Sequence, residues 1–418
     1  MAFVKFNGFG LGGTERWMQM MAQSLPKIGY EIDFFSCVLS GTNPSSDESR
    51  REALKANGVR VFDCGLQRRN LKYRHHPWVG SDFWDKFNLS DYDLVQAAKA
   101  GHAEYPFTEM RGTRLVEFRS LDTRVDRTRE LRWSIHISEY QRRKWIQRAG
   151  DPFRSSVIPV PVQLPKVSGS LRTTLGLDSN TLVFGFHQRN SDAIYSSIPL
   201  AAFSALQLKN AAFLILGGSK RYSEQALDLG LKNFIQLEHT GDDKDISLFL
   251  QTLDVFSHGR GDGETFGAVI AEAMSFGLPC LSHYVKGGSN AQPETMGPGG
   301  LFGIDVHDYT SKMQDLARSS TLRQDLGGAG LDLATEKYSP SATTVLLKSV
   351  YETVMGNGMS SSTFALGLNV VSTPRSGSVT KLERRRAPWS RVREGLSRLA
   401  DRLSYAAYQV VLWSRKSS

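Results

Sequence analysis

Two acidic residues stand eight positions apart in a glycine-rich stretch of the second half of the chain. Glu264 follows Gly263 directly, and Glu272 lies within a run of good helix formers from Ala268 to Phe276. A carboxylate in an otherwise apolar helix needs hydrogen-bond donors, because an unpaired buried charge is costly. The two hydroxyls of a ribose are donors of this kind, so Glu272 is a candidate for binding a nucleotide.

The loop between the two acids is a candidate anion site. The helix formers end at Gly277 and Pro279, in the order expected at a helix C-terminus, so the helix begins near Phe266 and Gly267. The first N–H groups of a helix have no partner inside it, and the helix dipole is positive at that end. This loop is therefore predicted to bind a diphosphate.

The same stretch resembles the Glu-seven residues-Glu signature of retaining GT-B glycosyltransferases, family 4 in particular. The resemblance implies that Glu264 holds hydroxyls of the donor sugar and that Glu272 holds the ribose. It also implies that the amides of Phe266 and Gly267 hold the phosphates. For the whole chain it implies an α/β fold with two Rossmann-like domains that face each other across a cleft. A surface helix that carries two acids by chance is the alternative interpretation.

A strand, a glycine loop and a helix open the chain. Gly8, Gly10 and Gly13 satisfy Gly-x-Gly-x-x-Gly, so a dinucleotide-binding oxidoreductase has to be considered. That fingerprint needs an acidic residue at the end of the second strand, whereas the strand expected at 31–37 has its acids at the beginning. Gly12 and Gly13 instead resemble the Gly-Gly loop of family 4, which lets the N-terminal domain approach the donor. A tight turn that needs glycine is the alternative.

His102 follows a short apolar strand expected at 94–96. A residue just past the C-terminal end of a parallel strand lies where open α/β sheets bind ligands. Family 4 members often have a His in this loop, so the resemblance assigns His102 a catalytic role in orienting the donor sugar. A structural role is the alternative. The acid pairs within 91–93 and 243–245 lack a third ligand, and they are interpreted as structural rather than as metal sites.

Three prolines between 157 and 165 mark an extended segment that cannot be a central strand. Two strands precede it, at 115–118 and 135–138, and a helix is expected after each. We place the domain boundary at this segment. The predicted parts are an acceptor-side domain (1–160), a nucleotide-sugar-binding domain (161–340), a closing helix that returns to the first domain (341–356), a flexible linker (357–380) and a basic amphipathic helix (381–418).

Arg189 follows the first strand of the second domain, at about 181–186. It resembles the Gly-Arg of family 4, whose guanidinium clamps the donor diphosphate with two hydrogen bonds. The family usually adds a Lys a few residues later, and this chain has none between Arg189 and Leu208. Lys220 or Arg221, after the next strand, are candidates for the second positive charge.

The net charge of +9 belongs mainly to the end of the chain. Residues 381–418 hold ten basic and three acidic residues, whereas the other 380 residues hold 41 basic and 39 acidic ones. The near-neutral body argues against nucleic-acid binding. In the tail, apolar residues from Trp389 to Trp413 recur at spacings of three and four with arginines between them, as in helices that lie on anionic membranes. A coiled-coil dimer and a helix docked on the body are the alternatives.

Cysteines and the start of the chain bear on the compartment. Cys37, Cys64 and Cys280 are too few and too scattered for a disulfide framework or a zinc site, which favours a reducing compartment. No signal-peptide pattern and no run long enough to span a membrane is found. We expect a cytoplasmic protein, with the tail allowing a peripheral position on the inner face of the cell membrane.

The resemblance implies a retaining transfer of a hexose from a nucleoside-diphosphate sugar to a hydroxyl of a saccharide or lipid-linked acceptor, in cell-surface polysaccharide or glycolipid assembly. No cofactor and no metal is expected, because the helix N-terminus at Phe266 and Gly267, together with Arg189, would stabilise the leaving diphosphate. Two alternatives stay open. One is a non-catalytic partner that binds nucleotide sugars, favoured by the absent Lys, and the other is a different GT-B activity such as a nucleotide-sugar epimerase.

Overall fold

The computed structural model describes residues 1–6, 8–10, 12–38, 48–65, 81–99, 105–120 and 124–356 of the 418-residue chain. The chain divides into two units, Met1–Gly358 and Met359–Ser418, and all described residues lie in the first. The predicted positions of His102, the linker and the basic amphipathic helix lie outside the described residues.

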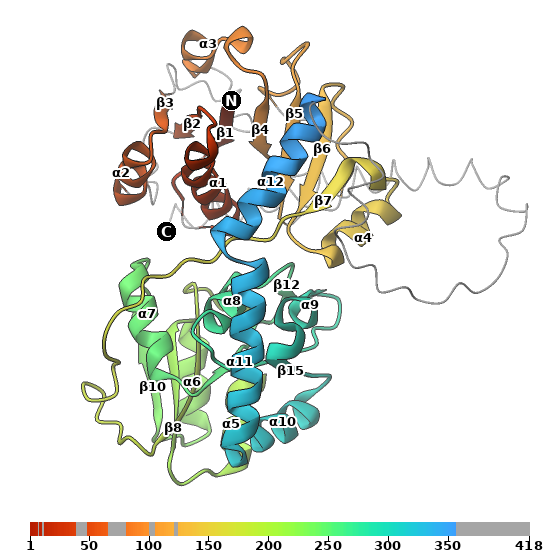
Figure 1. Cartoon of the computed structure of the whole chain (residues 1–418). Helices are drawn as coiled ribbons and strands as arrows, with labels where there is room; N and C mark the ends of the chain where they lie inside the picture. Colours follow the sequence, from red (N-terminus) through yellow and green to blue (C-terminus); the bar gives the residue numbers. More distant parts are fainter. Residues whose placement is uncertain are drawn as a thin grey trace, which may run out of the picture. The chain divides into compact units, whose positions relative to one another are not determined.

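The described part of the first half forms a parallel sheet of seven strands in the order β3-β2-β1-β4-β5-β6-β7. Its strands are β1 (Ala2–Phe6), β2 (Asp33–Val38), β3 (Arg60–Gly65), β4 (Val95–Ala98), β5 (Leu115–Arg119), β6 (Leu131–His136) and β7 (Ser155–Val157). Its helices are α1 (Gly13–Ser24), η1 (Leu25–Ile28), α2 (Glu48–Ala56), α3 (Phe83–Lys86), η3 (Leu89–Asp91), α4 (Glu139–Gln147) and η4 (Pro152–Arg154). We call this part the first lobe (Figure 1).

The second lobe contains a parallel sheet of six strands in the order β10-β9-β8-β11-β13-β15. Its strands are β8 (Leu182–Gln188), β9 (Ala211–Gly217), β10 (Phe234–Leu237), β11 (Val255–Ser257), β13 (Cys280–His283) and β15 (Gly300–Gly303), and a separate pair is formed by β12 (Gly263–Glu264) and β14 (Ser289–Asn290). Its helices are η5 (Asp192–Ile194), α5 (Ile198–Leu206), α6 (Lys220–Asp228), α7 (Asp243–Thr252), α8 (Ala268–Met274), α9 (Gln292–Met296), η6 (Gly297–Gly299), α10 (Val306–Arg318) and α11 (Ser320–Lys337).

Local sequence explains the main elements. The strand β9 reads Ala-Ala-Phe-Leu-Ile-Leu-Gly and is buried at every position, as expected of a strand that helices cover on both faces. The helix α7 begins after Asp242, whose side chain accepts hydrogen bonds from the N–H groups of Lys244 and Asp245. The helix α8 ends in the predicted way, because Gly277 has a left-handed φ of 71° that closes the turn.

The last described helix, α12 (Pro340–Met355), packs on the first lobe although it follows the second lobe in sequence. Figure 1 shows it, in blue, beside α1 and in front of the first sheet, and it contacts α1 and β6. The hydroxyl of Tyr351 donates a hydrogen bond of 2.9 Å to the side chain of Gln96 on β4. The end of unit 1 is thereby fixed against the first sheet.

The expectation of a helix after β5 is wrong. Residues 124–130, between β5 and β6, have no helical structure, and only residues 121–123 of this connection lie outside the described chain. Residues 124–130 carry five arginine or acidic side chains with one Val and one Thr among them, and they have no apolar residues at helical spacing. Asp126 is instead buried and accepts from Lys99, so the connection is held as an extended crossover.

The two parallel α/β sheets confirm the predicted fold class. In each sheet, the first four strands of the lobe lie side by side in the order 3-2-1-4, which is the Rossmann order. Among the described helices, none combines the length and apolar character that crossing a membrane requires.

Candidate functional site

Each sheet has a point where the strand order reverses, between β1 and β4 in the first lobe and between β8 and β11 in the second. Ligands of open α/β sheets bind outside the carboxyl ends of the strands at such points. The glycine loop follows β1, Arg189 follows β8, and the signature stretch from Gly263 follows β11. The predicted site residues of the second lobe therefore follow the C-terminal ends of two adjacent strands, at the same edge of the sheet.

The signature loop depends on two glycines. Gly263 has a φ of 72°, and a Cβ on it would lie 1.8 Å from the carbonyl oxygen of Ser289. Gly267 has a φ of 93° and is the N-cap of α8. Both conformations disfavour other residues, so glycine lets the chain turn from β12 into the helix.

Glu272 lies on α8 and is buried, with 7% of its surface exposed. One of its carboxylate oxygens is 3.2 Å from Nε2 of His187, the penultimate residue of β8. Burial alone would raise the pKa of Glu272, but the neighbouring His187 and the guanidinium of Arg16 hold the pKa below its usual value. A buried carboxylate is thus kept ionised next to the end of the strand that precedes Arg189.

Glu264 lies in β12 and is partly exposed. Its Oε1 atom accepts a hydrogen bond of 3.2 Å from Arg260 and is 3.5 Å from Nε2 of His258. Arg260 also donates to both carboxylate oxygens of Asp262, at 2.5 and 3.1 Å. The first acid of the signature therefore sits in a charged cluster from the loop after β11.

Phe266 is buried and anchors the loop. Its ring packs edge to face against Tyr338 with 5.2 Å between centroids, and its carbonyl accepts from the Thr295 hydroxyl. The first N–H groups of α8, next to Gly267, have no acceptor within the helix. The helix α8 has only seven residues, so its dipole is short.

In the first lobe, Gly12 is the N-cap of α1, and both Gly12 and Gly13 are exposed at the carboxyl edge of the sheet. Three residues later, Arg16 reaches the second lobe and donates two hydrogen bonds of 3.0 Å to the carboxylate of Asp243 on α7. The sequence interpretation missed Arg16. The signal available was that it is the first basic residue after the glycine pair.

Arg189 is exposed directly after β8, two residues beyond His187. Lys220, one candidate for the second positive charge, is paired with Glu224 at 3.4 Å on α6. Arg221 is the neighbouring candidate and is exposed. Arg189 therefore follows the same strand end from which His187 contacts Glu272.

The first turn of α4 contacts the signature loop from the first lobe. The hydroxyl of Ser138, the N-cap of α4, donates to the carbonyl of Thr265. The carboxylate of Glu294 on α9 accepts from the N–H groups of Glu139, at 2.6 Å, and Tyr140, at 2.8 Å. The loop that carries Glu264 is thus bounded by groups from both lobes.

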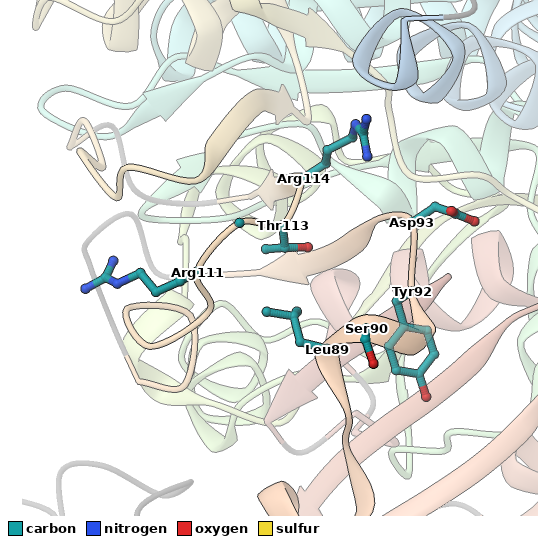
Figure 2. A pocket seen from close by; sticks show the side chains of 8 residues that line it. Leu89, Ser90, Tyr92, Asp93, Arg111, Thr113 and Arg114 are labelled. Carbon is teal, nitrogen blue, oxygen red and sulfur yellow. The ribbon is translucent and has the colours of Figure 1, made fainter.

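A cavity of about 420 Å³ lies elsewhere, before the N-terminal ends of β4 and β5. It is lined by 89–90, 92–93 and 111–114, and Figure 2 shows Arg111 and Arg114 pointing away from each other. Arg111 is paired with Glu130 at 3.3 Å. This cavity is at the sheet edge opposite the candidate site, and its charged side chains do not converge.

The fold is that of an α/β protein with two Rossmann-like sheets. Residues 174–327 match the family model described as Glycosyl transferases group 1. The matched segment contains Arg189, Glu264 and Glu272, and it supports the assignment to the group 1 glycosyltransferase family. Among curated protein sequences, none matches this chain.

Solved glycosyltransferase structures share the fold. The Anabaena protein Alr3699/HepE, crystallised with UDP and glucose, is 15% identical with a TM-score of 0.64, and the alignment covers 84% of this chain and 100% of HepE. Sucrose-phosphate synthase from Thermosynechococcus elongatus is 14% identical with a TM-score of 0.64, covering 85% and 99%. WaaG, a glycosyltransferase involved in lipopolysaccharide biosynthesis, is 14% identical with a TM-score of 0.58, covering 82% and 98%.

Proposed function

We propose that this protein is a retaining glycosyltransferase that moves a hexose from a nucleoside-diphosphate sugar to a hydroxyl of a saccharide or lipid-linked acceptor. Glu272 binds the ribose, Glu264 and His102 orient the sugar, and Gly12 and Gly13 let the first lobe approach the donor. Arg189 and the amides of Phe266 and Gly267 stabilise the charge that develops on the departing diphosphate, without a metal.

One observation carries the proposal. The carboxylate of Glu272 is buried, has a lowered pKa, and lies at the strand-order reversal beside the end of β8. An ionised buried carboxylate at a ligand-binding edge requires hydrogen-bond donors, and a ribose diol supplies two. The complexes of HepE with UDP, glucose and UDP-glucose support a nucleotide sugar as the donor.

The test is a thermal-shift screen of uridine, guanosine and adenosine diphosphate sugars on the full chain. We expect one base to raise the melting temperature, because a ligand that binds only the folded state stabilises it. Glu272→Gln and Arg189→Ala are expected to reduce the shift strongly, whereas Lys232→Ala, an exposed residue of the same lobe, should leave it unchanged. Equal shifts for all variants would contradict the assigned roles.

A non-catalytic nucleotide-sugar-binding partner is the second candidate, because no Lys follows Arg189 before Leu208. The two functions separate once a stabilising donor is known. Incubation of that donor with acceptor extracts yields glycosylated product and free nucleoside diphosphate for the enzyme, and neither for the binding partner. Free nucleoside diphosphate together with a free epimerised sugar, without glycosylated product, points to an activity such as a hydrolysing epimerase.

For the pathway and the site of action, we propose cell-surface polysaccharide or glycolipid assembly at the inner face of the cell membrane. The shared fold with WaaG supports the pathway. The basic amphipathic pattern of 381–418 supports contact with an anionic membrane surface. Sedimentation with anionic vesicles should require 381–418 and weaken with added salt, whereas salt-insensitive self-association would favour the coiled-coil alternative.

A further inference from the structure

Both acids of the signature have a buried histidine neighbour that the proposed donor site does not use. His187 comes from the end of β8 and is 3.2 Å from a carboxylate oxygen of Glu272. His258 follows β11 directly and is 3.5 Å from Oε1 of Glu264. Because β8 and β11 are neighbours, one sheet edge supplies a basic ring to each acid.

The position of the His187 ring is fixed by its surroundings. The side chain is 7% exposed, and its ring lies against Phe256 and Phe249 with 5.9 and 6.4 Å between centroids. Its Nε2 atom is 3.2 Å from the Glu272 carboxylate and has no aligned hydrogen-bond partner among the described residues. A proton on Nε2 therefore has the Glu272 carboxylate within hydrogen-bonding distance.

The His258 ring is oriented from its other side. It is 2% exposed, and its Nδ1 atom is 2.9 Å from the hydroxyl of Ser282 on β13. A proton on Nε2 lets Nδ1 accept from the Ser282 hydroxyl while Nε2 faces Glu264, which satisfies both nitrogens. Arg260 adds its hydrogen bond of 3.2 Å to the same Glu264 oxygen.

We propose that His187 and His258 are positioning residues with separate effects on the two halves of the donor. His187 holds the Glu272 carboxylate in one rotamer, so it sets the affinity for the nucleoside. His258, with Arg260, holds the Glu264 carboxylate in one rotamer, so it sets the affinity for the sugar. A carboxylate accepts up to four hydrogen bonds, so each acid keeps acceptor sites for substrate hydroxyls. This inference rests on the proposed function, because it uses the ribose and sugar roles of the two acids.

The experiment compares a nucleotide with its sugar conjugate. Dissociation constants for UDP and UDP-glucose are measured by calorimetry on the full chain, or for the guanosine or adenosine pair if the screen selects that base. His187→Phe keeps the aromatic packing and removes the donor, and it should weaken both ligands by the same factor, roughly tenfold to a hundredfold. His258→Phe should weaken UDP-glucose by a similar factor and leave UDP unchanged.

Two further variants separate positioning from folding. His187→Gln places an amide N–H near the position of Nε2 and should restore most of the UDP affinity. His136→Phe changes a fully buried histidine in the first lobe and should leave both affinities as in the wild type. If the variants acted only by a general loss of folding, His136→Phe would lower the affinities for both ligands as well.

The outcomes separate the inference from the proposed function. A wild-type protein that binds none of the nucleotide pairs contradicts the proposed function, and this inference with it. A wild-type protein that binds, with His187→Phe binding UDP equally well, contradicts the inference alone. The same holds if His258→Phe weakens UDP as much as UDP-glucose, because the ring would then only support the loop.

Discussion

His136 shows at the scale of one residue how the first lobe depends on pH. Its side chain is fully buried on β6, with the Trp145 ring 4.7 Å away between centroids. Burial, together with the nearby Arg119 and Arg142, lowers the pKa of His136 to about 3. The unfolded chain binds a proton here below about pH 6.5, whereas the folded chain does so only near pH 3. The unfolded state therefore gains stability relative to the folded state as the pH falls through this range.

This residue predicts a measurable change in the pH dependence of unfolding. At pH 5, a neutral buried His136 costs about 2 kcal/mol of folding free energy relative to pH 7.5. Urea unfolding at the two pH values should show a pH effect smaller by about that amount in His136→Phe than in the wild type. His283, whose burial lowers its pKa to about 4, contributes equally in both proteins and cancels. An unchanged pH effect would mean that His136 is protonated in the folded state.

Sequence reasoning at this scale found the residues that share one short stretch. Glu264 and Glu272 stand out because one continuous stretch, a loop followed by a helix, contains both. The neighbours of these acids were harder to find, because the sheet brings them together from distant positions. His187 and Glu272 are 85 positions apart, and no local pattern relates them. Arg260 lies four positions before Glu264, yet an extended loop gives that spacing no fixed geometry.

At the scale of elements, the short β12–β14 pair is the feature that a single substitution tests most directly. Gly263→Ala would place a Cβ 1.8 Å from the Ser289 carbonyl oxygen, so the two strands must separate and Glu264 must move. We expect nucleotide-sugar binding in calorimetry to weaken at least about tenfold, as for the loss of a charged hydrogen-bonding group.

The matched control for this substitution is Gly287→Ala. Gly287 also has a left-handed φ, of 76°, but a Cβ there would meet nothing within 4 Å. Only the backbone strain of about 1 to 2 kcal/mol remains, which should lower stability without changing affinity. If the two variants bind the donor equally well, the position of Glu264 does not depend on this strand pair.

Element types followed from local patterns where apolar periodicity was strong. The closing helix expected at 341–356 corresponds to α12 (Pro340–Met355) within one residue at each end. The connection from β5 to β6 lacked such a pattern, and its predicted helix is absent from residues 124–130. There the buried ion pair of Lys99 and Asp126 fixes the crossover, and such a pair joins residues that are distant in sequence.

At the scale of the whole molecule, two groups of contacts join the lobes within unit 1. Arg16 on α1 binds Asp243 on α7, and the first turn of α4 binds Glu294 on α9. The two-domain α/β fold was predictable from two strand-loop-helix openings and a proline-rich crossover. These contacts were not, because they join residues 227 and 155 positions apart and depend on how the finished lobes meet.

The Glu294 contact predicts a coupling between the lobes at the signature loop. Its carboxylate accepts from two N–H groups of α4, and the adjacent Thr295 hydroxyl donates to the Phe266 carbonyl. Ser138, at the start of α4, in turn donates to the Thr265 carbonyl. Removing the Glu294 carboxylate should therefore loosen both the first turn of α4 and the loop from Glu264 to Gly267.

Hydrogen–deuterium exchange of Glu294→Ala measures this coupling. Loss of the two hydrogen bonds of the exposed Glu294 carboxylate corresponds to about 1 to 2 kcal/mol, so exchange in both segments should become roughly tenfold faster. Glu336→Ala, an exposed acid on α11, should leave both segments unchanged. Faster exchange confined to α4 would show that Glu294 only caps that helix, and that the signature loop keeps its order independently of the first lobe. Faster exchange in both segments would mean that the position of Glu264 depends on the contact between the lobes.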